Sequence, residues 1–312
     1  MRQTILLYTA VLALTFSCKS KEEEEKVNLD TFKEKVSYVL GADHSHSITE
    51  ANDAHFSEYD IDEMVKGFEE GLKNDNAFDD ACKSSMVKLL GENGQKFDAA
   101  YAKEGSRCLG KLSGVIFQTS WKKKGAMQSL DMQNVITGFR HGLLKKDTLV
   151  SQRDQITMIQ TFFEDLNKMN GIALLDKAKK IPGAKITDSG LVLETIQEGS
   201  GNSPAATDDV LAHYILINST GDTLQNSFDM VRMYQQPLRP FSLKAVVKGW
   251  QEGMPMMKKG GKYRLYVPYQ SGYGEQGMFD PQSNSYSIQP YESLVFYIEL
   301  IDYGKEGSLS KP

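Results

Sequence analysis

The fold of the C-terminal part of this chain is decided by two stretches, Val246-Val247-Lys248-Gly249-Trp250-Gln251-Glu252-Gly253 and Lys262-Tyr263-Arg264-Leu265-Tyr266-Val267-Pro268. The first predicts a short helix over Val246–Gln251, and the second has the alternation that is typical of a strand. Further strands are predicted over Leu191–Ile196, Val210–Leu216 and Ser293–Leu300. Several strands curled round one short helix make a small α+β domain.

Other motifs stand in a fixed order around these two stretches. They are Asp188-Ser189-Gly190-Leu191, Glu198-Gly199-Ser200-Gly201, His213-Tyr214, Gly221-Asp222-Thr223, Met257 with Gly260, Tyr273-Gly274, and Leu294-Val295-Phe296 with Glu299-Leu300. Together they resemble an FKBP-type prolyl cis–trans isomerase domain over residues 185–303. The resemblance implies an antiparallel sheet curled round a short helix. It also implies an isomerase that assists protein folding and acts on proline-containing or unfolded polypeptides.

The site of such a domain is lined by aromatic side chains, because the reaction needs no acid pair or nucleophile. Rotation about a prolyl peptide bond meets a barrier of ~18–20 kcal/mol, but no bond is made or broken. An apolar cradle disfavours the dipolar resonance form of the amide, and placed hydrogen bonds can favour the twisted transition state. The resemblance implies that Trp250 is the floor under the proline ring, that Tyr214, Val246, Val247 and Phe296 are walls, that the Tyr273 hydroxyl reaches a substrate carbonyl, and that Ile288 closes one side. No cofactor or metal is required.

Two adjacent positions depart from the family's Gly-Thr-x-Phe-Asp-Ser pattern. Aligning Asp222–Ser227 to it places Gln225 at the aromatic wall and Asn226 at the acid. Asn226, which completes the predicted catalytic set, keeps the hydrogen-bonding capacity without the charge, whereas Gln225 puts a polar chain into the substrate-binding wall. Phe228-Asp229 would take over these places only if the strand carried a bulge.

Further departures affect the rim of the site. A second pocket aromatic of the family falls at Leu238 or Arg239, and we take Leu238 as a substrate-binding residue. Residues 279–286 lengthen a loop that touches substrate in this family. Losing an aromatic wall removes ~1–3 kcal/mol of binding, enough to slow catalysis ten- to hundredfold. Two functions stay open: an isomerase of reduced activity, or a non-catalytic peptide-binding chaperone or surface interaction module.

The N-terminal half has helical periodicity and contains two similar stretches. Val65–Leu72 matches Ile136–Leu143 at a constant offset (138 − 67 = 71), and Lys35–Val39 echoes Lys111–Val115. The pattern resembles the dimerisation module of Mip-type FKBPs (macrophage infectivity potentiator proteins), in which modules from two chains interlock. Both copies lie in one chain here, so we expect a pseudo-dimeric monomer, with a homodimer as the alternative. Glycines inside helices cost roughly 1 kcal/mol each, which indicates close helix crossings at Gly67, Gly71, Gly138 and Gly142.

The predicted boundaries follow from these patterns. Copy 1 covers 31–105, copy 2 with its connecting helix covers 106–172, a linker covers 173–184, and a tail of 304–312 follows the isomerase domain. The fold class is therefore α+β, with an all-helical N-terminal domain before the FKBP-like sheet.

The first residues are typical of a secretory signal. Arg2 precedes the apolar run Ile5–Phe16, which is shorter than the ~20 residues that a membrane-spanning helix needs. Cys18 and the run Glu22–Glu25 follow, which resembles a lipoprotein signal: residues 1–17 would be removed, Cys18 acylated, and 18–30 would form an acidic tether. A plain cleaved signal and an apolar anchor are the alternatives. We expect a cell-envelope protein held by lipid to the outer membrane, on its periplasmic or surface face.

Composition and residue counts bear on three further questions: nucleic-acid binding, a disulfide and a metal site. Of 312 residues, 40% are hydrophobic and 25% charged, which is ordinary for a globular protein, and the net charge of -5 argues against nucleic-acid binding. Cys82 and Cys108 could form a disulfide in an oxidising compartment, or both could be small buried residues. His44-Ser45-His46 has no evident third ligand, so no metal site is predicted.

Overall fold

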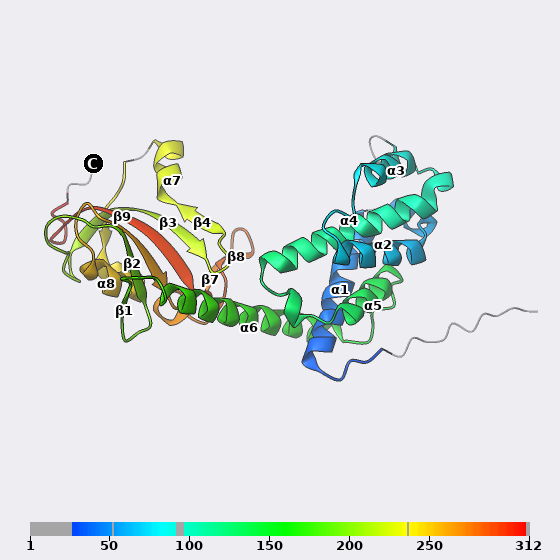
Figure 1. The fold of residues 1–312 in the computed structure, drawn as a ribbon, viewed down its shortest axis with the longest axis horizontal. Helices are drawn as coiled ribbons and strands as arrows, with labels where there is room; N and C mark the ends of the chain where they lie inside the picture. Colours follow the sequence, from blue (N-terminus) through cyan, green and yellow to red (C-terminus); the bar gives the residue numbers. More distant parts are fainter. Residues whose placement is uncertain (1–26, 52, 92–96, 236, 310–312) are drawn as a thin grey trace, which may run out of the picture.

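The computed structural model describes residues 27–51, 53–91, 97–235 and 237–309. A helical module and a β-rich domain lie at the two ends of the long helix α6 (Gln152–Ala178), which joins them (Figure 1). This confirms the predicted α+β class. The signal segment, Cys18 and the glutamate run lie outside the described residues, so the predictions made for them are not addressed by the fold. In the described ranges, no helix has the length and apolarity needed to cross a membrane.

The helical module is built from α1 (Phe32–Ala51), α2 (Ile61–Lys73), α3 (Asp80–Leu90), α4 (Ala102–Lys123) and α5 (Met132–Leu143). Side-chain caps fix several of its helix starts. Asp60, Asp79 and Asp131 each accept a hydrogen bond from the backbone N–H three residues later, at the first turns of α2, α3 and α5. Such caps satisfy amides that have no partner within the helix.

The two copies interlock within the module. Helix α1 of the first copy packs on α5 of the second, and α2 packs on α4. Phe68 of α2 and Phe139 of α5 stack at the centre, with 3.8 Å between ring centroids and an angle of 8°. Because each first helix pairs with the second helix of the other copy, neither copy has a complete core of its own.

A pair of equivalent hydrogen bonds gives the register of the two copies. The Asp131 amide donates to Ser37 Oγ at 2.8 Å, and the Asp60 amide donates to Ser106 Oγ at 3.0 Å. Ser37 therefore corresponds to Ser106 (106 − 37 = 69) and not to Ser113, as the echo of Lys35–Val39 in Lys111–Val115 had suggested. The error is seven residues, which is close to two helical turns, so both registers present a similar face.

The helical glycines lie at close crossings, as predicted. A Cβ added to Gly67 or Gly138 would lie 1.9 Å from the carbonyl oxygen of Arg107 or Tyr38 respectively. At Gly71 it would lie 2.3 Å from the Lys111 oxygen, and at Gly142 it would lie 2.0 Å from the Ser45 hydroxyl oxygen. Glycine is thus needed for the backbones of the paired helices to approach one another.

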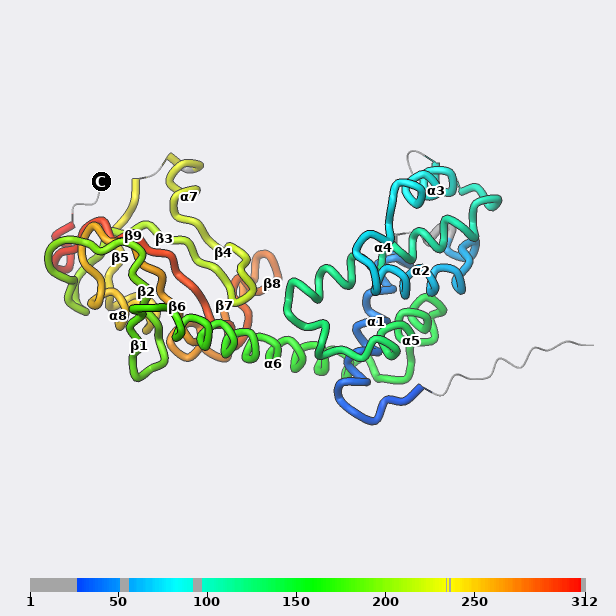
Figure 2. Tube along the Cα trace, viewed as in Figure 1, coloured from blue at the N-terminus to red at the C-terminus, as the bar shows by residue number. Residues whose placement is uncertain are grey.

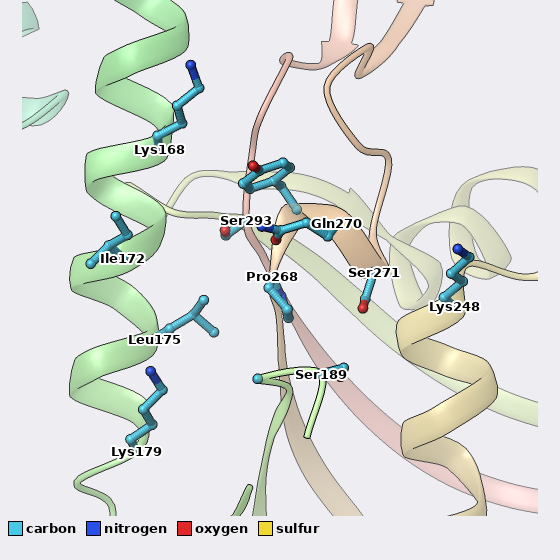
Figure 3. A pocket seen from close by; sticks show the side chains of 12 residues that line it. Lys168, Ile172, Leu175, Lys179, Ser189, Lys248, Pro268, Gln270, Ser271 and Ser293 are labelled. Carbon is cyan, nitrogen blue, oxygen red and sulfur yellow. The ribbon is translucent and has the colours of Figure 1, made fainter. Parts of the chain in front are cut away.

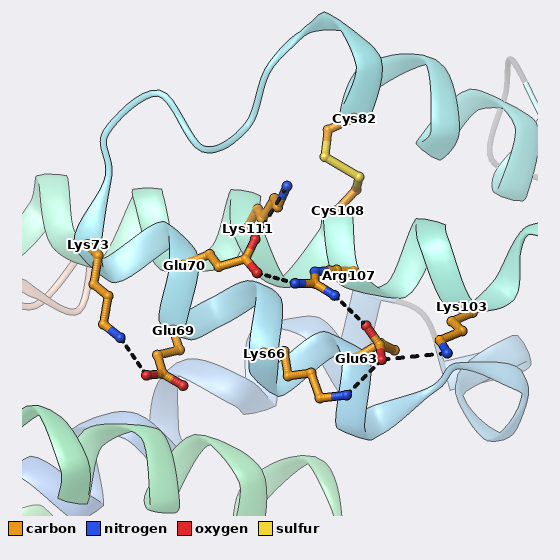
Figure 4. A network of polar contacts seen from close by, with 10 residues as sticks. All are labelled: Glu63, Lys66, Glu69, Glu70, Lys73, Cys82, Lys103, Arg107, Cys108 and Lys111. Carbon is orange, nitrogen blue, oxygen red and sulfur yellow. Dashed lines mark hydrogen bonds and ion pairs between the residues drawn. A yellow bond between two sulfur atoms is a disulfide. The ribbon is translucent and has the colours of Figure 1, made fainter.

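A disulfide and an ion-pair network join helices of the first copy to α4 (Figure 4). Cys82 of α3 is bonded to Cys108 of α4, which settles the alternative left open by the sequence. Arg107, the residue before Cys108, pairs with Glu63 at 3.1 Å and also with Glu70, both on α2. Lys66, followed by Arg107, holds the pKa of the Glu63 carboxyl below its usual range.

The main sheet of the β-rich domain is antiparallel and has seven strands. Its order is β1 (Lys185–Ile186), β2 (Val192–Gln197), β6 (Lys262–Val267), β9 (Leu294–Gly304), β3 (Asp209–Asn218) and β4 (Thr223–Asn226), with β5 (Phe241–Ser242) paired to β3. The short helix α8 (Lys248–Gly253) lies within the curl of the sheet, and Val247 precedes it as the N-cap. A hairpin of β7 (Met278–Asp280) and β8 (Ser285–Ile288) occupies the lengthened loop.

The two faces of the sheet meet different partners because side chains alternate along a strand. Leu265 and Phe296 face inward and pack with Trp250 of α8. Their neighbours Tyr266 and Val295 face outward and pack with the end of α6 at Ala178. Residues 173–178, which fall in the predicted linker, are therefore helical, and the buried Ala178 packs against the sheet with the half-buried Leu174 and Leu175. Figure 2 follows the chain through α6 into β1.

Candidate functional site

The centre of the site is a buried indole with rings around it. Trp250 of α8 is 4% exposed. Tyr214 of β3, Phe241 of β5 and Phe296 of β9 meet it edge-on, with centroid distances of 5.5, 5.7 and 5.4 Å and interplanar angles of 88°, 74° and 77°. Edge-to-face packing is favourable for aromatic pairs, so the four rings hold one another in place.

Most of the predicted site residues are brought together here. Val246, Val247, Tyr273 and the buried Ile288 all pack in the same core cluster as Trp250. Leu238 is not in this cluster, whereas Phe241 is. Phe241 is the further ring found against Trp250, and the assignment of the second pocket aromatic to Leu238 stays a prediction.

Gln225 and Asn226 have defined partners. Gln225 Oε1 accepts the Tyr214 hydroxyl at 3.0 Å, so its polar chain orients a wall residue of the site. Asn226 caps helix α7 (Ser227–Tyr234): its Oδ1 accepts the Phe228 amide at 3.0 Å, and its Nδ2 donates to Asp229 Oδ2 at 2.7 Å. Both therefore act in the local structure, one on a ring and one on a helix start.

The strand that carries them has a bulge, but not the one that would have used Phe228. Leu216 faces Gln225 and Ile217 faces Thr223, so Leu224 is the extra residue. Leu224 packs against the core cluster and supplies an apolar side chain that the alignment had missed. Phe228 instead stacks on His213, with 4.2 Å between centroids, and is not part of the ring set around Trp250.

Burial sets the ionisation of the two tyrosines in the site. It raises the pKa of the Tyr273 phenol above its usual value. It also raises the pKa of Tyr214, to which the nearby Tyr273 adds. Both hydroxyls are thus protonated at neutral pH, and each can donate one hydrogen bond. The Tyr214 hydroxyl donates its hydrogen bond to Gln225. The Tyr273 hydroxyl has no acceptor among the described residues.

No metal-binding group of three His, Cys, Asp or Glu side chains is found in the described part of the chain. His44, one of the two histidines in His44-Ser45-His46, has a hydrogen-bond partner in the helical module. His44 Nε2 lies 2.9 Å from Ser113 Oγ, and burial lowers the pKa of its imidazole.

The ring set around Trp250 can enclose an apolar ring and exclude water from an attached amide. The Tyr273 hydroxyl offers one hydrogen-bond donor there.

Comparison with known proteins places this domain. A sequence profile described as "FKBP-type peptidyl-prolyl cis-trans isomerase" matches residues 201–301. The FKBP-type peptidyl-prolyl cis-trans isomerase FkpA of Buchnera aphidicola is 32% identical over 232 residues, covering 69% of this chain and 84% of that protein. The peptidyl-prolyl cis-trans isomerase Mip of Coxiella burnetii is 33% identical, covering 57% and 78%. The crystal structure of FkpA from Escherichia coli matches with a TM-score of 0.38 and 26% identity, covering 65% of this chain and 96% of that one.

Proposed function

This chain belongs to the FKBP-type peptidyl-prolyl cis–trans isomerases, and from that premise we propose that the ring set around Trp250 is its prolyl site. The protein is a folding factor that isomerises X-Pro bonds. The observation that carries the assignment of the site is the edge-on enclosure of one buried indole by Tyr214, Phe241 and Phe296. The flat indole face gives a proline ring an apolar floor, and Val246, Val247 and Ile288 close its sides.

The proposed catalysis works by desolvation and by one hydrogen bond. Water stabilises the dipolar resonance form of an amide, so moving the bond into an apolar site lowers the ~18–20 kcal/mol barrier to rotation. Tyr273 keeps its proton at neutral pH and donates it to a substrate carbonyl, which fixes the residue next to the proline. Tyr214, held by Gln225, forms a rigid wall.

We propose that Gln225 reduces this activity by replacing an aromatic wall. The double substitution Gln225→Phe/Asn226→Asp is expected to raise kcat/KM on a short proline peptide by about tenfold, since an apolar wall restores ~1–3 kcal/mol. Asp keeps the acceptor for the Phe228 amide but loses the donor to Asp229 Oδ2, so Gln225→Phe alone is measured beside the double variant. Unchanged or lower activity in the double variant would contradict the role given to Gln225.

The same assay separates the isomerase from a second function. The polar wall at Gln225 also suits a domain that binds proline-containing or extended peptides without turnover, as a chaperone or surface interaction module. A silent wild type beside an active double variant would favour that function. Measurable wild-type turnover that is lost in Trp250→Ala would favour the isomerase.

We propose that Cys18 is lipidated and ties the protein to the outer membrane through the acidic tether 18–30. The support is the sequence: an apolar run that ends before Ser17-Cys18, followed by charged residues. Metabolic labelling with a radioactive fatty acid should mark the wild type and leave Cys18→Ala unlabelled. Label retained in Cys18→Ala would contradict the proposal.

We propose that the protein is a monomer whose two helical copies take the place of two subunits. The support is the pairing of α1 with α5 and of α2 with α4 inside one chain, which already covers the apolar faces of all four helices. Light scattering on the chain from Lys19 to Pro312 should give a mass close to one chain across a hundredfold range of concentration. A stable mass of two chains would contradict it.

A further inference from the structure

A cavity of about 710 Å³ lies between α6 and the isomerase domain (Figure 3). We call it the α6 groove. One side is a stripe of α6, formed by Lys168, Ile172, Leu175 and Lys179 at helical spacing. The opposite side comes from the isomerase domain: Ser189, Gly190, Lys248, Pro268–Ser271 and Ser293. Its volume falls in the range of roughly 300–1,000 Å³ that is typical of ligand sites.

The α6 groove is separate from the prolyl site but adjoins it. Lys248, which lines the groove, and Trp250, the floor of the prolyl site, are two residues apart on α8. Successive helical residues are about 100° apart, so these two side chains leave the helix on opposite sides. The turn Tyr269–Ser271 likewise lines the groove and leads to Tyr273.

The lining of the groove is positively charged, whereas the chain as a whole is negatively charged. Three of the twelve lining residues are lysines and none is acidic, although the protein carries a net charge of -5. Lys248 is exposed and has no ion pair among the described residues. Lys179 pairs with Asp176 on its own helix at 3.2 Å. Lys168 pairs with Asp165 at 3.2 Å, and its ammonium also lies 4.0 Å from the centroid of the Tyr291 ring. Exposed pairs of this kind are weak, so both ammonium groups can turn to a ligand.

Between the lysines the lining is apolar. Ile172 is 63% exposed, which is unusual for a large aliphatic side chain in the middle of a helix that touches a domain. Leu175, Pro268 and the Tyr269 ring lie beside it. The hydroxyls of Ser271 and Ser293 and the amide of Gln270 add hydrogen-bonding groups around this strip. The Ser189 hydroxyl is already engaged, because it donates to Glu252 Oε2 at 2.6 Å. A ligand that fits must combine negative charge with an apolar group.

We propose that the α6 groove binds an acidic segment of an extended polypeptide that carries an apolar side chain between its acids. The proposal rests on the proposed function, because a client bound there would be held beside the prolyl site. An extended chain alternates its side chains, so one apolar residue can enter the Ile172 strip while backbone groups meet the hydroxyls. Its carboxylates then pair with Lys168, Lys179 and Lys248.

The test is fluorescence anisotropy with a labelled peptide of about eight residues, alternating Asp and Leu and free of proline. Because the peptide lacks proline, its binding does not report on the prolyl site. The chain from Lys19 to Pro312 should bind it, and more weakly as salt is raised from about 0.05 to 0.5 M. Lys179→Glu/Lys248→Glu should weaken binding at least about tenfold. Ile172→Asn should weaken it without changing the net charge.

A matched control is Lys177→Glu/Lys185→Glu, which changes the net charge equally at two exposed lysines that do not line the groove. It should bind the peptide as the wild type does, and circular dichroism should show that all variants are folded. Equal loss in both double variants would overturn the proposal, since attraction would then be non-specific. So would absence of wild-type binding, or binding to vesicles of phosphatidylglycerol but not to the peptide. None of these results alters the proline-peptide assay, so a failure of the groove and a failure of the prolyl site are distinguishable.

Discussion

Replacing Trp250 by alanine is expected to lower kcat/KM for a short proline peptide by about 100-fold, which corresponds to ~2.7 kcal/mol of transition-state stabilisation. The indole is the surface on which the three other rings converge, and it is 4% exposed. Its removal leaves a hole that water can enter, and water restores the dipolar form of the substrate amide. The measurement is a protease-coupled or NMR exchange assay of isomerisation.

The alanine variant also loses core packing, so a second variant keeps the prediction testable. Trp→Ala in a core typically costs about 3–5 kcal/mol of stability, which could unfold the domain. Trp250→Phe keeps an apolar ring and should retain the fold with an activity loss of about tenfold. A near-ultraviolet circular dichroism spectrum distinguishes a folded, inactive variant from an unfolded one.

A matched control removes an aromatic ring of the same domain that is not in the ring set. Phe228 stacks on His213 and does not contact the indole. Phe228→Ala should therefore keep kcat/KM within about twofold of the wild type. A large loss in Phe228→Ala, or full activity in a folded Trp250→Ala, would contradict the assignment of the prolyl site.

The sequence was sufficient for the parts of the site that lie in regular structure. Trp250 and Phe296 sit in a helix and a strand whose motifs have fixed spacing, and the predicted helix and strand are present around them. Phe241, which also meets Trp250, was not among the predicted site residues, because the sequence before it has no periodicity that would give its register. Leu224 was missed for a related reason, since a bulge changes the face of a strand without a distinct local pattern.

The helical module shows a different limit of sequence analysis. The duplication was visible in the Gly-Phe-x-x-Gly-Leu stretches at an offset of 71, but the first helices were aligned seven residues out of register. A helix presents nearly the same face after seven residues, so only a contact between the copies could decide which of the two registers is right. The hydrogen bonds of Ser37 to Asp131 and of Ser106 to Asp60 supply that contact. The groove along α6 could not be foreseen either, because it depends on how the helix sits on the sheet.

Gly110→Ala is expected to destabilise the helical module by about 3 kcal/mol or more, although alanine is the better helix former. A Cβ at Gly110 of α4 would lie 2.0 Å from the Met64 carbonyl oxygen and 2.9 Å from the Phe68 nitrogen, both backbone atoms of α2. Backbone cannot turn aside as a side chain can. The two helices must therefore separate, and they carry much of the contact between the copies.

Gly105→Ala is the matched control, because Gly105 lies on the same helix and the three atoms nearest to its added Cβ belong to the Leu89 side chain and not to backbone. A side chain can shift and the gain in helix propensity of ~1 kcal/mol offsets part of that contact, so this variant should lose clearly less stability than Gly110→Ala. The chain has two tryptophans, Trp121 in the helical core and Trp250 in the isomerase core. In a Trp250→Phe background, urea unfolding followed by tryptophan fluorescence thus reports on the helical module alone.

The comparison of the stabilities of Gly110→Ala and Gly105→Ala decides how the two copies are joined. A large loss in Gly110→Ala beside a small one in Gly105→Ala means that the module depends on backbone contact between α2 and α4, so the copies fold only as an interlocked pair. Similar small losses in both variants would mean that the crossing is looser and that the glycines are not required there. The monomer proposal would then lose its main support, because a loosely joined pair of copies could exchange helices with a second chain.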